Sequence, residues 1–286
     1  MKLFKSVEPY RLLFPIGLMF GALGVYGWIA FAFFPNSEYP VQLHSKLMLG
    51  TFLFSFAAGF LMTAIPKMTA SFPAQPFELS IAFVLVLANA LCAYLARAEF
   101  FYLMSAISIL SLIVFFSRRF RARTKSPPPF FPFVIMGLLA GIAGASIMSL
   151  NGVVQIPVEL LMFAKKIYFE GMILFLVLGI GSRLIPVISG RGTANEKNGL
   201  KIIVRNILLG TGLIAAFALE SSNFLEVGGM LKGLIATWVA VFGWNIFAKS
   251  QTKSRLALGM RISGLMVLLG IYRLIKGKGA AKAIKD

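Results

Sequence analysis

Long apolar runs, separated by short polar loops, follow one another along the chain. The runs are about 20 residues long, which is the length that crosses a bilayer as a helix. They do not alternate with a period of two residues, which excludes a membrane β-barrel. Lipid offers the backbone no hydrogen-bond partners, so each run must be a helix. The pattern predicts an all-α polytopic transmembrane helical bundle of about nine helices. The expected spans are residues 12–34, 45–66, 77–96, 100–116, 132–150, 166–188, 202–220, 229–248 and 256–275.

An internal repeat divides this pattern. The segment LHSKLMLGTFLFSFAAGFLMTAIPKMTA (43–70) aligns with FAKKIYFEGMILFLVLGIGSRLIPVISG (163–190), so that Lys46 meets Lys166. An even number of spans in each half predicts a parallel duplication, as transporters and other membrane proteins have; a chance match is the alternative. The predicted parts are a first four-helix repeat (1–120), a basic proline-rich linker (121–131), a second four-helix repeat (132–248), and a ninth helix with a basic tail (249–286).

Composition and charge agree with a membrane protein and suggest its orientation. The chain is 58% hydrophobic, and 28 Lys and Arg outnumber 10 Asp and Glu. No aromatic–basic module accompanies this charge, so nucleic-acid binding is not expected. The basic residues lie mostly in short loops, and by the positive-inside rule the linker and the N-terminus face the cytoplasm. A ninth crossing would put the basic tail outside; the alternative is a ninth helix that lies in the membrane interface.

The single histidine, His44, is the first residue of a candidate metal site. It stands at the start of the second span with Met48 one helical turn further on, in a stripe of small and softly polar residues. Imidazole and thioether ligate both haem iron and copper, so this pair could hold either. The alternative is that the stripe packs against another helix. One histidine excludes most multi-histidine centres, and one cysteine excludes a CxxC site.

Charged side chains lie inside or beside the apolar runs. Lys46 and Lys166 hold equivalent places; they either snorkel to the headgroups or face each other across a site for an anion such as a haem propionate. Glu170, four residues after Lys166, is expected to pair with it, for structure or for function. Arg183 is expected to reach the anionic leaflet. Asn89, in the third span, is expected to make an interhelical hydrogen bond.

Two segments resemble the NnrS family of bacterial membrane proteins. The pieces are PYRLLFPIGLMFGALGVYGWIA (9–30) and residues 43–70. The family has an H-A-H-E-M-like box followed by an A-G-F-L-L-T-A-V-P-like run; His44 matches the first histidine and Met48 the methionine. A later family stretch ends in T-R-x-x-x-G-H-x-G-R, and this sequence is similar at three positions. These are Arg183, Gly190 and Arg191.

The resemblance implies a function and also shows departures. The family is associated with the nitric-oxide response and described as containing haem and copper. It implies a protein of the bacterial inner membrane that supports nitric-oxide or respiratory metabolism, with His44 as axial haem ligand and Lys46 and Lys166 near the propionates. The family's other histidines fall on Lys46, Lys166 and Ile188 here. Bis-histidine ligation within one chain is therefore excluded, and a single-histidine haem, a His/Met site or a site shared between subunits remains.

Two other functions are left open. The repeat and the Lys166–Glu170 pair would suit a small-solute transporter or permease. A cofactor-free assembly or scaffold protein, as a homo-oligomer or with a respiratory-complex partner, is the other. No Walker A motif, nucleophile elbow, CxxCH motif or hydrolase-like carboxylate cluster occurs, so no autonomous enzymatic activity is expected.

Overall fold

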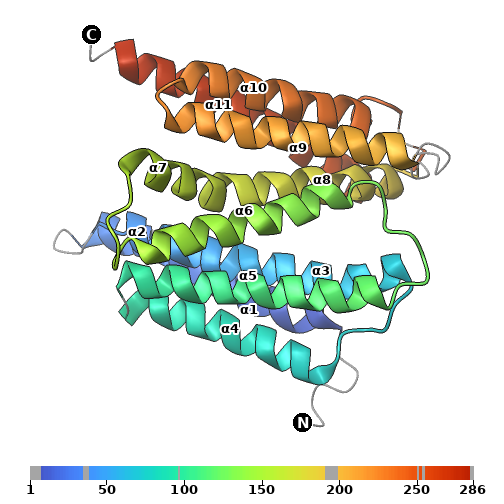
Figure 1. Ribbon diagram of the computed structural model, residues 1–286, viewed down its shortest axis with the longest axis horizontal. Coiled ribbons are helices and arrows are strands. Elements are labelled where there is room, and N and C mark those ends of the chain that lie inside the picture. The colour runs from blue at the N-terminus through green and yellow to red at the C-terminus, as the bar shows by residue number, and fades with distance from the viewer. Residues whose placement is uncertain are drawn as a thin grey trace. The chain divides into compact units, whose positions relative to one another are not determined.

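Helices make up the fold of this protein in the computed structural model, which describes residues 8–34, 39–95, 97–190, 199–249, 251–252 and 255–283. Within these ranges there is no strand (Figure 1). The π-helical segments carry the labels η2, η3 and η5. The elements are α1 (Pro9–Phe33), α2 (Val41–Lys46), η2 (Leu47–Leu53), α3 (Phe54–Thr69), α4 (Pro76–Leu95), α5 (Ala98–Arg121), α6 (Phe131–Leu150), α7 (Val158–Lys166), η3 (Ile167–Gly171), α8 (Met172–Ile188), α9 (Gly199–Ser221), α10 (Leu225–Trp238), η5 (Val239–Gly243) and α11 (Arg255–Ala283).

Eight stretches of the described chain are long and apolar enough to cross a membrane. They are α1, α2 to α3, α4, α5, α6, α7 to α8, α9, and α10 to η5. The prediction of an all-α polytopic bundle is confirmed. The predicted ninth helix forms as α11, which is not among the eight candidate spans. The basic residues before α1 (1–7) and the end of the tail (284–286) lie outside the described residues.

Proline closes the two long composite spans in the same way. Pro66 lies three residues before the end of α3 and Pro186 two residues before the end of α8. A proline ring removes a helical hydrogen bond and clashes with the preceding turn, so termination soon after it is expected. After α3 the chain turns at Ala70, whose φ of 47° is left-handed. The Thr124 hydroxyl of the linker donates to the Ala70 carbonyl at 3.0 Å, which ties the linker to this end of α3.

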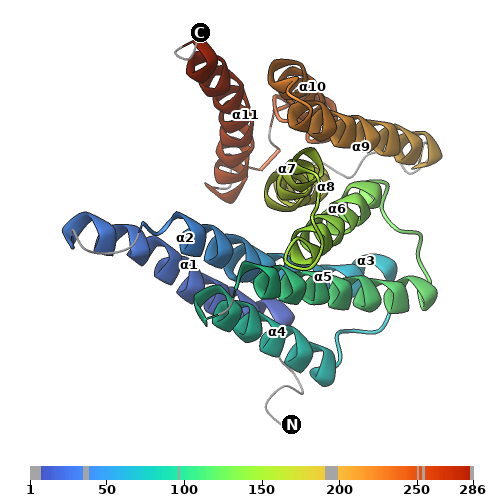
Figure 2. The ribbon, with the colours of Figure 1, turned by 60° about the vertical axis from the view of Figure 1, so that its left-hand side comes forward.

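The chain divides into two compact units. Unit 1 comprises Met1–Pro127 and Ala145–Gln155, and unit 2 comprises Pro128–Gly144 and Ile156–Asp286, so α6 contributes to both. In unit 1, α1 packs along α3 and α4 along α5. In unit 2, α9 packs along α10, and α11 contacts α8 and α10. Both views show the α4–α5 and α9–α10 pairs side by side (Figures 1 and 2).

Small residues bring α1 close to its neighbour in unit 1. Gly17, Gly21 and Gly24 lie on one face of α1, spaced by about one helical turn. A Cβ atom at Gly21 would stand 2.8 Å from the ring of Phe52, which is too close for any side chain. In a membrane such small-residue faces let helices pack backbone to backbone. This contact sets the distance at which residues of α2 and η2 meet α1.

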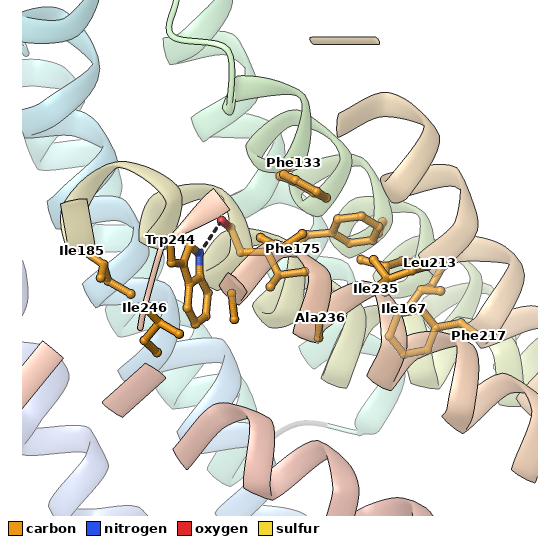
Figure 3. Packing of buried hydrophobic residues seen from close by; sticks show 14 residues of the cluster. Phe133, Ile167, Phe175, Ile185, Leu213, Phe217, Ile235, Ala236, Trp244 and Ile246 are labelled. Carbon is orange, nitrogen blue, oxygen red and sulfur yellow. Dashed lines mark hydrogen bonds between the residues drawn. The ribbon is translucent and has the colours of Figure 1, made fainter. Parts of the chain in front are cut away.

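Buried aromatic and aliphatic side chains hold unit 2 together (Figure 3). Phe175 of α8 lies among residues of α6 and α9, and the indole Nε1 of Trp244 donates a hydrogen bond to the Leu178 carbonyl at 3.3 Å. That bond satisfies the one polar atom of an otherwise buried ring. The same cluster includes residues of α10, so α8, α9 and α10 form one packed group.

Candidate functional site

Two of the π-helical segments, η2 and η3, begin 120 residues apart, at Leu47 and Ile167. Each directly follows a lysine, Lys46 in unit 1 and Lys166 in unit 2. This offset equals the shift of the sequence repeat, so both repeat segments carry a π-helical turn at the same place. π-Helical turns are rare and often lie at functional sites. The side chains around η2 and η3 are therefore the first candidates for a site.

His44 is held against α1 in unit 1. Its Nδ1 lies 3.0 Å from the carbonyl oxygen of Gly24, and its ring meets that of Trp28 edge-on at 5.8 Å between centroids. A carbonyl oxygen only accepts hydrogen bonds, so Nδ1 is the donor and Nε2 is the ring nitrogen that can offer a lone pair to a metal. Metal-ligating histidines have this arrangement, with the second nitrogen bonded to a backbone carbonyl or carboxylate.

Met48 lies beside the same point of α1. A Cβ atom added to Gly24 would stand 3.4 Å from the sulfur of Met48, so the thioether packs against the glycine whose carbonyl holds His44. The structure thus brings the two predicted metal ligands to one residue of α1. Both side chains are half-buried.

Lys46 contacts an aromatic ring. Its Nζ lies 5.7 Å from the centre of the Phe101 ring, within the range of a cation–π interaction. The ring of Phe101 also reaches η2, because a Cβ atom at Gly50 would stand 2.6 Å from it. One buried ring of α5 therefore contacts Lys46 and fills the space beside Gly50.

In unit 2 the equivalent region holds a chain of four alternating charges. Lys166 Nζ lies 2.5 Å from Glu220 Oε2, and Lys232 Nζ lies 2.9 Å from the other oxygen of that carboxylate. Lys232 also pairs with Glu170 at 2.9 Å. The inner members are buried, with side chains 4% exposed for Lys232 and 1% for Glu220, whereas that of Glu170 is 38% exposed. Charges inside a membrane span need partners, and this network supplies them.

The ion-pair partner predicted for Glu170 needs correction. The sequence nominated Lys166, four residues away, but the structure gives Glu170 its ion pair with Lys232 of α10 and gives Lys166 its ion pair with Glu220 of α9. Helix spacing identifies only local partners, whereas α9 and α10 bring charges from distant positions. The sequence alone could have nominated Glu220 and Lys232, because each is a charged residue within a predicted span and such charges need partners.

A second buried ion cluster lies in unit 1. The guanidinium of Arg119 donates to both carboxylate oxygens of Glu78, and Arg118 donates to Oε1 at 2.7 Å. Arg119 is fully buried between the rings of Phe72 and Phe115, 4.4 and 3.6 Å from their centres. The sequence pattern ended the fourth span at residue 116, three residues before Arg119. In the structure α5 continues to Arg121, and only the fold shows that this arginine turns inward.

A family model, described as NnrS protein, matches residues 6–278. The chain belongs to the NnrS family. No match was found among curated proteins or among solved structures. The eight apolar helices and the family together make this NnrS-family member a multi-pass membrane protein in contact with the lipid bilayer.

The end of the NnrS-like stretch in unit 2 is held by a neighbouring segment. Arg183 is half-buried on α8, and Gly190 follows with a φ of 73°, a conformation that favours glycine. The hydroxyl of Thr252 donates to the Ile188 carbonyl at 3.0 Å, so the chain beyond η5 closes over this turn. Arg191 lies outside the described residues.

The donor atoms in this NnrS-family chain suit some metal centres better than others. Among the described residues no group of three or more His, Cys, Asp or Glu side chains could hold a metal ion. The sequence has one histidine, so one copy of this chain cannot build a multi-histidine centre. The single imidazole of His44, with Nδ1 bonded to a carbonyl and Met48 beside it, fits single-histidine haem ligation.

Proposed function

We propose that this NnrS-family protein binds one haem through His44 Nε2 and supports nitric-oxide or respiratory metabolism in the bacterial inner membrane. The observation that carries the proposal is the hydrogen bond between His44 Nδ1 and the Gly24 carbonyl, which leaves the lone pair on Nε2. Bound haem would supply an iron that takes up an electron or a diatomic gas.

Each residue near His44 has a role in this proposal. The Gly24 carbonyl fixes the tautomer and the plane of the imidazole. Met48 would supply a thioether beside the imidazole, and the ammonium of Lys46 would pair with a propionate. Lys166 and Glu170 receive no haem contact, because their charges already take part in the ion network of unit 2.

Orientation follows from the positive-inside rule. A cytoplasmic N-terminus and one crossing by α1 would put His44 at the periplasmic face of the membrane. A reporter that is active only in the cytoplasm should then be active when it is inserted in the 121–131 linker, and a reporter that is active only in the periplasm should be inactive there.

The absorption spectrum tests haem binding. The protein is purified in detergent and titrated with haem, and we expect a Soret band that His44→Ala removes. Gln42→Ala, an exposed change on the same short helix, should leave the band unchanged. Met48→Leu should shift the Soret band, because the thioether packs against the glycine that holds His44. Absence of a Soret band, or a band indifferent to His44→Ala, would overturn the proposal.

Ion-coupled solute transport is a second candidate, favoured by the charge network of unit 2. Lys232 and Glu220 are buried within candidate spans, and the half-exposed Glu170 gives the network an end through which ions could enter. Proteoliposomes with an entrapped pH dye would report proton flux under an imposed potential. Glu170→Gln should reduce the flux, and the exposed Glu159→Gln should not. A proton flux that Glu170→Gln leaves unchanged would count against transport. A protein that shows neither haem binding nor proton flux would favour an assembly or scaffold role.

A further inference from the structure

A groove of about 290 Å³ lies on unit 1 between α4 and α5, with Met62 of α3 beneath it. Ala82 and Leu112 contribute buried apolar surface to its lining. Its rim is also apolar but exposed, formed on α5 by Ile107, Leu110 and Val114. Figures 1 and 2 show the two helices side by side along their length. Both helices are candidate membrane spans, so lipid is the expected surrounding of this exposed apolar rim.

The groove changes character along its length. Glu78 and Arg118 line one end, and the remaining lining is almost wholly apolar. From Ile107 to Arg118 the helix advances eleven residues, which is about 16 Å at 1.5 Å per residue. A charged end at the last turn of α5, followed by an apolar channel directed into the bilayer, matches the order of headgroup and acyl chain in a phospholipid.

The charged end has a positive surplus. Arg119 is buried and bonded to both oxygens of Glu78, so it neutralises that carboxylate. Arg118 also contacts Glu78, yet its side chain is 44% exposed, and it carries the charge that the cluster presents outward. Its guanidinium lies 5.4 Å from the centre of the Phe77 ring, so carboxylate and ring hold it in place.

Further basic residues follow this end of α5. Arg121, Arg123 and Lys125 are exposed and lie within seven residues of Arg118. Basic pockets between membrane helices bind anionic lipid headgroups, and guanidinium pairs with phosphate through charge-assisted hydrogen bonds.

We propose that this groove binds one anionic phospholipid, with an acyl chain along α4 and α5 and the phosphate on Arg118. A volume of about 290 Å³ is at the lower end of ligand pockets, which are on the order of 300–1,000 Å³, and suits part of one chain. Neither His44 nor the ion network of unit 2 contributes to this site, so it stands independently of the proposed function.

Native mass spectrometry of the detergent-solubilised protein tests the site with phosphatidylglycerol and phosphatidylcholine as probes. We expect one phosphatidylglycerol to be retained in preference to phosphatidylcholine, and Arg118→Gln to weaken that retention roughly tenfold through the loss of a charge-assisted bond. Arg97→Gln removes the same charge from an exposed side chain before α5 and should have no effect. Equal retention of the two lipids, or equal effects of the two arginine variants, would overturn the proposal.

Two further variants test the headgroup contact and the acyl-chain groove separately. Ser111→Phe places a ring in the groove and leaves Arg118 in place, so it should abolish retention of the lipid while the melting temperature shows that the protein is folded. Arg118→Lys should restore part of the retention lost in Arg118→Gln. If inorganic phosphate displaces the lipid and Ser111→Phe has no effect, the site is a phosphate site without an acyl groove, and the proposal fails.

Discussion

At matching positions of their π-helical segments, unit 1 carries Gly50 and unit 2 carries Glu170. In unit 1 the ring of Phe101 packs against the glycine, and Lys46 lies over that ring at 5.7 Å. In unit 2 the carboxylate pairs with Lys232. The same backbone irregularity therefore accommodates either an aromatic ring or an ion-paired carboxylate, depending on what the neighbouring helices supply.

Two polar networks, one in each unit, differ in charge. Apart from the Glu78–Arg119 cluster at one end of α4 and α5, unit 1 has a neutral network between these helices, in which Asn89 donates to Ser108 at 2.6 Å and accepts from Ser105 at 3.0 Å. This confirms the interhelical hydrogen bond expected of Asn89. Unit 2 instead joins α7, α9 and α10 through ion pairs centred on Glu220 and Lys232. Neutral bonds in lipid are worth about 1 kcal/mol, whereas breaking a buried ion pair costs more, so these two networks should differ in their sensitivity to substitution.

The largest effect is expected at Lys232. Lys232→Met leaves Glu220 with one partner fewer and removes the partner of Glu170, so the free energy of unfolding should fall by about 3–5 kcal/mol. Thermal unfolding in detergent measures this. The double variant Glu220→Leu with Lys232→Met should recover part of the loss, because it also removes the buried carboxylate that had lost the Lys232 ammonium. If Lys232→Met alone lowered the free energy of unfolding no more than Asn89→Leu does, the charged and the neutral network would not differ in sensitivity.

The π-helical segments should differ next. Gly50→Ala places a Cβ atom 2.6 Å from the fully buried ring of Phe101, and overpacking of this kind costs about 1–3 kcal/mol. Gly171→Ala, in η3, meets Phe217 at 3.3 Å and should be milder. Both changes gain the same helix propensity, so the difference between their melting temperatures reports the packing alone. Phe101→Leu should rescue Gly50→Ala; equal destabilisation at the two glycines would contradict this.

A smaller effect is expected in the neutral network. Asn89→Leu removes two interhelical hydrogen bonds, and we expect a loss of roughly 1–2 kcal/mol in the free energy of unfolding. Ser111→Ala is the matched control, since its hydroxyl bonds only to the Ser108 carbonyl of its own helix. The same unfolding assay applies. A loss comparable to that of Lys232→Met would show that the ion network of unit 2 is no more sensitive to substitution than the neutral network of unit 1.

The smallest effect is expected at the exposed pair of unit 1. Lys67 and Glu8 lie 2.8 Å apart with both side chains well exposed. Lys67→Met should change the free energy of unfolding by about 0–1 kcal/mol, and the change should shrink as salt is added. Melting curves at low and high ionic strength check this. A large, salt-independent loss would mean that this pair is shielded from solvent.

Hydropathy alone determined the class and the span pattern of this protein. An apolar run of about 20 residues has few alternatives in lipid, because only a helix or a closed barrel satisfies its backbone. The repeat shift of 120 residues and the placement of His44 and Met48 on one face were also readable from spacing, since both depend on local periodicity. The haem ligand remains a prediction of this kind.

Tertiary structure alone decided which charges meet. Lys166 and Glu220 are 54 positions apart in the sequence, and Lys232 and Glu170 are 62 apart. No periodicity links residues on different helices, so the nearest opposite charge, four residues away, was chosen as the partner of Glu170. The inward turn of Arg119 and the groove between α4 and α5 were hidden for the same reason. Each depends on how separate helices pack, and the pattern along one helix does not record that.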